Sequence, residues 1–310
     1  MGVNTSVATR PVGLDRLRRL LWWTAVANLV VNIGIVVTGG VVRLTGSGLG
    51  CPTWPRCTEE SYVAHGELGI NGVIEFGNRL LTFVLVAVAV ACWAVALVLA
   101  RRTPVDAERR WSALRLATII GVGIPAQAVI GGITVLTSLN PYVVALHLLV
   151  SLAIVGVCVL LLDELRGPTR PRSPARLRTT AVAAFVVGWA VLWLGTVVTG
   201  SGPHAGDLDA VRTGLDPETV SRLHALAVWL LVALTVAFLW QARRAGATVP
   251  LGAGLVLLGV ELVQGVIGYV QYFTGLPVLL VGLHMLGAAI TSAALTWVLL
   301  STRARVRPAA

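Results

Sequence analysis

Eight apolar segments, each close to the length that spans a lipid bilayer, are the feature that most restricts the fold of this chain. A membrane-crossing helix needs about 20 apolar residues. The segments lie at about 21–41, 74–99, 113–136, 143–163, 180–199, 221–240, 251–273 and 278–300. Backbone polar groups in lipid must be satisfied within the segment, so each should be helical. With 56% hydrophobic and only 12% charged residues, the sequence predicts an all-α integral membrane protein with eight transmembrane helices.

The placement of the arginines predicts the orientation of these helices. All 24 basic residues are arginine, and the formal net charge is +10. Most of them lie before the first segment, in alternate loops, or after the last segment. The exceptions are Arg43, Arg56, Arg79, Arg212 and Arg222. This distribution follows the positive-inside rule and predicts that both termini are cytoplasmic. The basic charge therefore indicates orientation in a membrane, and no nucleic-acid partner is expected.

Several short motifs occur twice and indicate an internal repeat. The repeated motifs are TGSG at 45–48 and 199–202, QAVIG at 127–131 with QGVIG at 264–268, and Leu-His at 146–147 and 283–284. The last two pairs have the same spacing. Four spans per half is an even number, so both halves should share one orientation, as parallel repeats do. We expect two pseudo-symmetric four-helix bundles, at 1–165 and 179–310, joined by the basic cytoplasmic linker 166–178.

Two histidines begin the sixth and eighth segments, one turn inside the predicted outer boundary. These are His224 and His284. An ionisable residue inside a membrane is costly and marks a functional site by default. Two imidazoles at matching depth on facing helices of one bundle suit the two axial positions of a haem iron. The alternative is that each histidine only forms a hydrogen bond between helices.

The first half has the same arrangement with one change. His147 begins the fourth segment, and the repeat partner of His224 is Asn78. Asparagine is a poor ligand for haem iron, so this site would hold iron by one imidazole at most. An open coordination face is where oxygen chemistry or substrate exchange can occur. The alternative is a hydrogen bond between His147 and Asn78.

Charged residues surround these predicted sites. Glu75 lies three residues before Asn78 and on the same side of the helix, where it could move protons or stabilise positive charge. Its alternative role is an ion pair with Arg79 or Arg43. Arg43, Arg79 and Arg222 lie at the outer boundary, where they could bind haem propionates or simply extend toward the membrane surface.

The four cysteines fall into two groups. Cys51 and Cys57 lie in the first outer loop, where a close pair outside the cytoplasm predicts a disulfide. A metal pair is the alternative, although no nearby histidine completes zinc spacing. Cys92 and Cys158 fall within segments and should pack as small apolar groups.

Taken together, these motifs resemble the haem A synthase family. The resemblance rests on VRLTGSGLGCPTWPRC after the first segment, IEFGNR at the second, TGSGPHAGD after the fifth, and Leu-His at the fourth, sixth and eighth. It implies an oxidoreductase of the cytoplasmic membrane, built as two similar four-helix halves. The C-terminal half would hold haem b between His224 and His284. The N-terminal half would oxidise a methyl group of haem O to a formyl group, giving haem A for cytochrome oxidase.

The resemblance also implies roles for single residues and for partners. The essential glutamate of the family matches Glu75, and its outer-loop cysteine pair matches Cys51 and Cys57. Many members have a histidine where this chain has Asn78, which leaves His147 as the sole expected protein ligand of the substrate iron. Haem O synthase and cytochrome oxidase assembly factors are the implied protein partners. The alternative functions are a non-enzymatic b-type cytochrome and a haem-transfer protein.

Overall fold

The structure is a computed structural model that describes residues 12–102, 107–166 and 169–305. Its elements are α1 (Val12–Leu44), the short 3₁₀ helix η1 (Gly66–Leu68), α2 (Gly69–Arg102), α3 (Ala107–Leu136), α4 (Pro141–Arg166), α5 (Ala175–Ser201), α6 (Pro217–Arg244), α7 (Thr248–Phe273) and α8 (Val278–Ser301). All eight long helices are apolar and long enough to cross a membrane, which confirms the predicted number and type of spans. The helices extend beyond the apolar segments because their polar end turns continue the same backbone hydrogen bonding.

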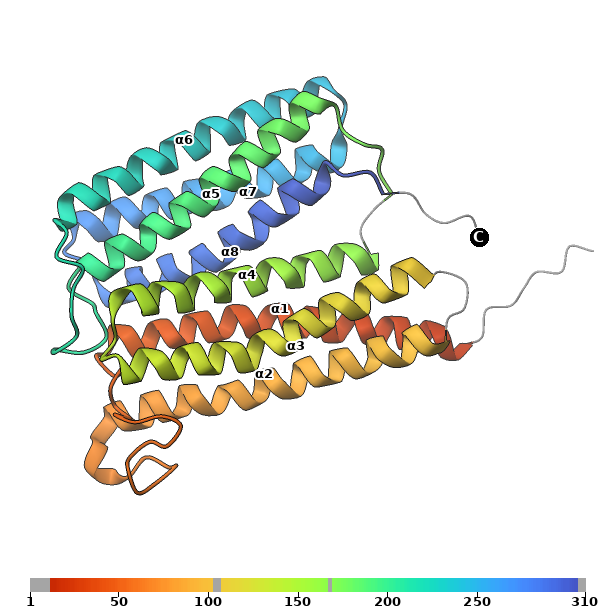
Figure 1. The fold of residues 1–310 in the computed structure, drawn as a ribbon. Helices are drawn as coiled ribbons and strands as arrows, with labels where there is room; N and C mark the ends of the chain where they lie inside the picture. The colour runs from red at the N-terminus through yellow and green to blue at the C-terminus, as the bar shows by residue number, and fades with distance from the viewer. Residues whose placement is uncertain (1–11, 103–106, 167–168, 306–310) are drawn as a thin grey trace, which may run out of the picture.

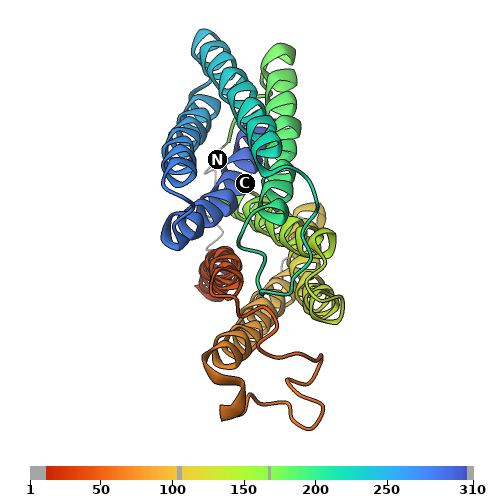
Figure 2. The same cartoon turned by 90° about the vertical axis from the view of Figure 1, so that its left-hand side faces the viewer.

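The helices form two groups, α1–α4 and α5–α8, that lie side by side (Figures 1 and 2). In the first half, α1 packs on α2, α2 on α3, α3 on α4, and α4 back on α1. In the second half, α5, α6, α7 and α8 pack in the same cyclic order. The halves meet where α8 contacts α1 and α4, and where α4 contacts α5.

The structure has two large apolar cores: one lies in the first half, and the other lies mainly in the second half and also includes Val36 and Leu152 of the first. Cys92, Ile120 and Cys158 are among the buried residues of the first core, and Phe238 and Leu257 are among those of the second. The prediction that Cys92 and Cys158 pack as small apolar groups is thus confirmed. Lipid is as apolar as these side chains, so close packing, rather than removal of apolar surface from water, must hold the helices together.

All the loops from 45 to 68, 137 to 140, 202 to 216 and 274 to 277 lie at one end of the molecule, which we call the histidine end. The start of α1 and the end of α8 lie at the opposite end (Figure 1). There, Asp163 accepts two hydrogen bonds from Arg170, at 3.0 and 2.9 Å, and lies 3.4 Å from Arg305. Arg170 also donates to the carbonyl group of Leu300 at 2.8 Å. This buried cluster ties the end of α4 to the residues that flank α5 and α8.

Replacing Asp163 by alanine should destabilise the protein substantially. The side chain of Arg170 is only 5% exposed, and removing its carboxylate partner leaves a buried charge, which costs about 3–5 kcal/mol. Thermal unfolding in detergent would measure the loss. Asp15→Ala is the matched control, because the Asp15–Arg18 pair is half-exposed and such pairs contribute little. Equal melting temperatures for the two variants would contradict this prediction.

Candidate functional site

The two predicted histidines of the second half face each other between α6 and α8. The ring centroids of His224 and His284 are 6.4 Å apart, and their planes are inclined by 76°. A metal–imidazole bond of about 2.0–2.1 Å on each side places the two ring centres about 6 Å apart. The observed separation of 6.4 Å therefore leaves room for one metal ion between the rings.

Both rings rest on a glycine of the preceding helix. A Cβ atom added to Gly195 on α5 would lie 3.4 Å from Cε1 of His224, and one added to Gly268 on α7 would lie 3.4 Å from Cε1 of His284. The Nδ1 atoms of both rings are buried without a hydrogen bond of normal geometry, although the Val191 carbonyl is near His224. The glycines thus lie against the Cε1 and Nδ1 atoms of the two rings.

The first half has one histidine in the same setting. A Cβ atom on Gly131 of α3 would lie 3.1 Å from Cε1 of His147 on α4. Gln127 donates to the carbonyl oxygen of His147 at 2.9 Å, which fixes that turn of the helix. The three histidines are therefore built alike, each against a glycine of the helix before it.

Asn78 on α2 is bonded to α1 rather than to the histidine. Its Oδ1 atom accepts a hydrogen bond from Thr38 at 2.8 Å. Within the described residues, no hydrogen bond joins Asn78 to His147, so the alternative in which these two residues pair is not observed. In the part of the chain that the structure describes, no imidazole faces His147 as His224 and His284 face each other.

Glu75 is buried and holds the first loop. One carboxylate oxygen accepts a hydrogen bond from the backbone N–H of Cys51 at 2.6 Å, and the other accepts from Nε of Arg79 at 3.1 Å. Arg79 in turn donates to the carbonyl oxygens of Cys51 and Thr53. The predicted ion pair between Glu75 and Arg79 is thus present, and it attaches the loop to α2.

The loop itself is closed by Cys51 and Cys57, which are joined as a disulfide. Both cysteines are fully buried. The pairing is compatible with the prediction from the sequence, and the metal alternative is not needed to explain it.

The other two predicted arginines make protein contacts. Arg43 donates to the carbonyl oxygens of His204 at 2.6 Å and Thr199 at 2.9 Å, so it joins α1 to the loop that follows α5. Arg222 pairs with Glu218 on the exposed surface of α6. Both have partners that the sequence analysis did not foresee.

A second intramembrane carboxylate, Glu261 on α7, is also buried. Its Oε1 atom accepts a hydrogen bond from Thr235 on α6 at 2.8 Å, while Oε2 has no hydrogen-bond partner. Glu261 lies two helical turns from Gly268, away from the histidine end. Sequence reasoning gave this residue no role, and its position inside the bundle is what marks it as unusual.

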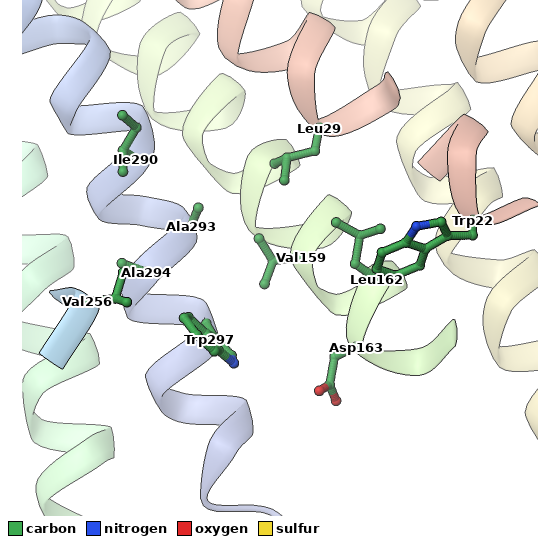
Figure 3. Close-up of a pocket in the computed structure, with 10 residues that line it drawn as sticks. All are labelled: Trp22, Leu29, Val159, Leu162, Asp163, Val256, Ile290, Ala293, Ala294 and Trp297. Carbon is green, nitrogen blue, oxygen red and sulfur yellow. The ribbon is translucent and has the colours of Figure 1, made fainter. Parts of the chain in front are cut away.

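An apolar cavity of about 350 Å³ opens between α1, α4 and α8 (Figure 3). It is lined by Trp22, Leu29, Val159, Leu162, Asp163, Val256, Ile290, Ala293, Ala294 and Trp297. None of the described histidines lines this cavity, although Ile290 is six residues from His284 on α8. The cavity is therefore distinct from the histidine sites.

The glycines beneath the histidines were missed as site residues. Their signal was present in the repeat, because Gly131 and Gly268 are the last residues of QAVIG and QGVIG. The repeat was used to infer two halves, and the reason why these positions need glycine became visible only with the histidine contacts.

The fold and the site define a multi-span helical membrane protein with histidines gathered at one end of its helices. The chain belongs to the family described as cytochrome oxidase assembly protein, whose model matches residues 21–206. This match runs from α1 through α5, so His224 and His284 lie beyond it.

Individual relatives extend the comparison. A haem A synthase from Rhizorhabdus wittichii is 26% identical, with 89% of this chain and 91% of the relative aligned. One from Methylobacterium radiotolerans is 28% identical over 66% of this chain and 62% of its own length. One from Bacillus pumilus is 31% identical over 52% of this chain, and the match spans half of that relative.

Proposed function

We propose that this protein is a haem A synthase, which oxidises a methyl group of haem O to the formyl group of haem A for cytochrome oxidase. One observation carries the proposal. The same glycine-backed histidine occurs in both halves, but only the second half has a facing imidazole. A closed site suits a resident cofactor, and a site with one imidazole suits a substrate that must react and leave. The haem A synthases among its relatives support the same activity.

In the second half, His224 and His284 would hold haem b. Haem iron between two imidazoles exchanges single electrons and has no open coordination position. Gly195 and Gly268 would let the two rings lie close to their neighbouring helices and so set the orientation of both ligands. The fit between the 6.4 Å ring separation and one metal ion supports this assignment.

In the first half, His147 would bind the iron of haem O on one side. Asn78, held by Thr38, would leave the other side without a protein ligand. Glu75 lies on the same helix as Asn78, one turn away, and its carboxylate would move a proton or stabilise positive charge near the reacting methyl group. Arg79 would hold that carboxylate and the loop in place.

The arrangement in the membrane follows from the same proposal. The cyclic packing of the helices in each half supports two pseudo-symmetric four-helix bundles, at 1–165 and 179–310, with 166–178 as a cytoplasmic linker. The arginine distribution supports cytoplasmic termini, with the histidine end on the outer side of the plasma membrane. Haem O synthase would deliver the substrate, and assembly factors would receive the product.

Identification of the extracted haems tests the function. The purified protein, extracted with acidified organic solvent and analysed by mass spectrometry, should contain haem b together with haem A, with or without unconverted haem O. Haem b alone would support a non-enzymatic b-type cytochrome. Haem b in the second half, with a first half that binds haem O but never converts it, would support a haem-transfer protein.

Replacing His147 by alanine should remove haem O and haem A from the extract while haem b is retained. His147 is the one protein ligand that we assign to the substrate iron, whereas the second site does not depend on it. His65→Ala is the control, because His65 is an exposed loop residue. Unchanged amounts of haem O and haem A in the His147 variant would rule out this assignment.

A further inference from the structure

Trp54, in the loop closed by Cys51 and Cys57, lies directly on a glycine of α3. A Cβ atom added to Gly132 would be 2.3 Å from Cδ2 and 2.5 Å from Cε2 of the indole ring. Contacts this short cannot be accommodated, so the ring can occupy this place only because residue 132 has no side chain. Gly132 is buried in this arrangement. It is also the neighbour of Gly131, which supports His147.

The repeat gives the corresponding position in the second half a different residue. Gly131 corresponds to Gly268, so Gly132 corresponds to Tyr269. The hydroxyl oxygen of Tyr269 accepts a hydrogen bond from Trp229 of α6 at 3.1 Å. Both halves thus have an aromatic ring at the position that follows the supporting glycine. In the second half a helix provides this ring, and in the first half a loop provides it.

The two rings differ in how they are held. Tyr269 and Trp229 belong to helices, and both side chains lie at the exposed surface of the bundle. Trp54 follows Thr53, whose carbonyl oxygen is bound by Arg79 at 3.1 Å, and it precedes Pro55 and Arg56, which are exposed. Arg79 of α2 binds the carbonyl oxygens of Thr53 and Arg56, on the two sides of Trp54. A loop, rather than a helix, therefore places the indole on α3.

We propose that Trp54 is a substrate-positioning residue that forms a wall of the first-half site. With the indole on Gly132, the ring closes the site beside His147 and packs against the haem substrate, as large aromatic surfaces do. This inference rests on the proposed function, in which the first-half haem exchanges and the second-half haem stays.

The experiment measures how fast haem O leaves the purified holoprotein. Excess apomyoglobin captures the released haem, and the absorption of haem b in the second half reports that the fold is intact. Trp54→Ala should release haem O roughly tenfold faster, the change expected when one well-packed aromatic contact is lost. Trp54→Phe should fall between this variant and the wild-type protein.

Gly132→Ala provides an independent test, because the added Cβ must displace the indole without changing the loop sequence. It should accelerate release in the same way as Trp54→Ala. Gly121→Ala is the matched control on the same helix, since a Cβ atom there meets nothing within 4 Å. It should release haem O at the wild-type rate.

The outcomes separate this inference from the proposed function. If the wild-type protein binds no haem O in its first half, the proposed function fails. If it binds haem O, and both Trp54→Ala and Gly132→Ala release it at the wild-type rate, the assignment of Trp54 as a wall is wrong while the proposed function stands. Acceleration by both variants, with Gly121→Ala unchanged, supports the wall.

Discussion

His284→Ala is expected to abolish the absorption of the second-half haem b, and His224→Ala is expected to do the same. The two rings are placed 6.4 Å apart, so each can complete the coordination begun by the other. Loss of a residue that merely supports a metal ligand already weakens metal binding by about 10–100-fold. Loss of a ligand itself should therefore empty the site or leave a spectrum without paired imidazoles.

The measurement is the reduced-minus-oxidised absorption spectrum of each purified variant, together with its haem b content. His147→Ala is an informative control, because it removes a similarly supported histidine from the other half and should keep the haem b spectrum. Normal haem b spectra in both second-half variants would show that these imidazoles are not the ligands. Our assignment of the two halves would then have to be abandoned.

The spans and the histidines could be predicted because a membrane restricts both so strongly. A backbone in lipid must be helical, so long apolar segments define helices whatever their neighbours are. An ionisable residue in the same environment needs a reason to be there, which singled out His147, His224 and His284. Neither inference required knowledge of which helices touch.

The contacts of the polar side chains could not be predicted, because they depend on residues far away in the sequence. Arg43 was expected near haem propionates or the membrane surface, and it binds carbonyl groups more than 150 residues later in the chain. A hydrogen bond between Asn78 and His147 was one alternative, but Asn78 accepts a hydrogen bond from Thr38 instead. Each outcome depends on the way the helices and loops meet, which local pattern does not encode.

The contact between Trp54 and Gly132 also could not be predicted from the sequence. The sequence contains both Trp54 and Gly132, but only the folded loop brings them together. The difference between Gly132 and Tyr269 could be read from the repeat, yet it has no meaning until the indole is placed. A position at which the two halves of a repeat differ is thus informative when a structure shows which side chain occupies the space left by the smaller residue.

Glu75→Ala is expected to stop haem A formation while the haem b spectrum remains normal. The change removes the acceptor for the Cys51 N–H group and the partner of Arg79. It also removes a carboxylate that we place beside the reacting methyl group, and a positioned acid or base contributes about 10²–10⁴-fold to a rate. The ratio of haem A to haem O in extracted haems, determined by mass spectrometry, measures the loss. Normal haem A from this variant would exclude Glu75 from the reaction.

Glu75→Gln separates the two roles of this residue. The amide oxygen of glutamine can still accept the hydrogen bond from Cys51, so the loop and Trp54 should remain on α3. The charge and the proton-carrying carboxylate are lost. If Glu75 acts only through the loop, this variant should make haem A and release haem O slowly, whereas Glu75→Ala should resemble Trp54→Ala. We expect instead that Glu75→Gln keeps slow release but makes no haem A, because the carboxylate itself is needed where the methyl group is oxidised.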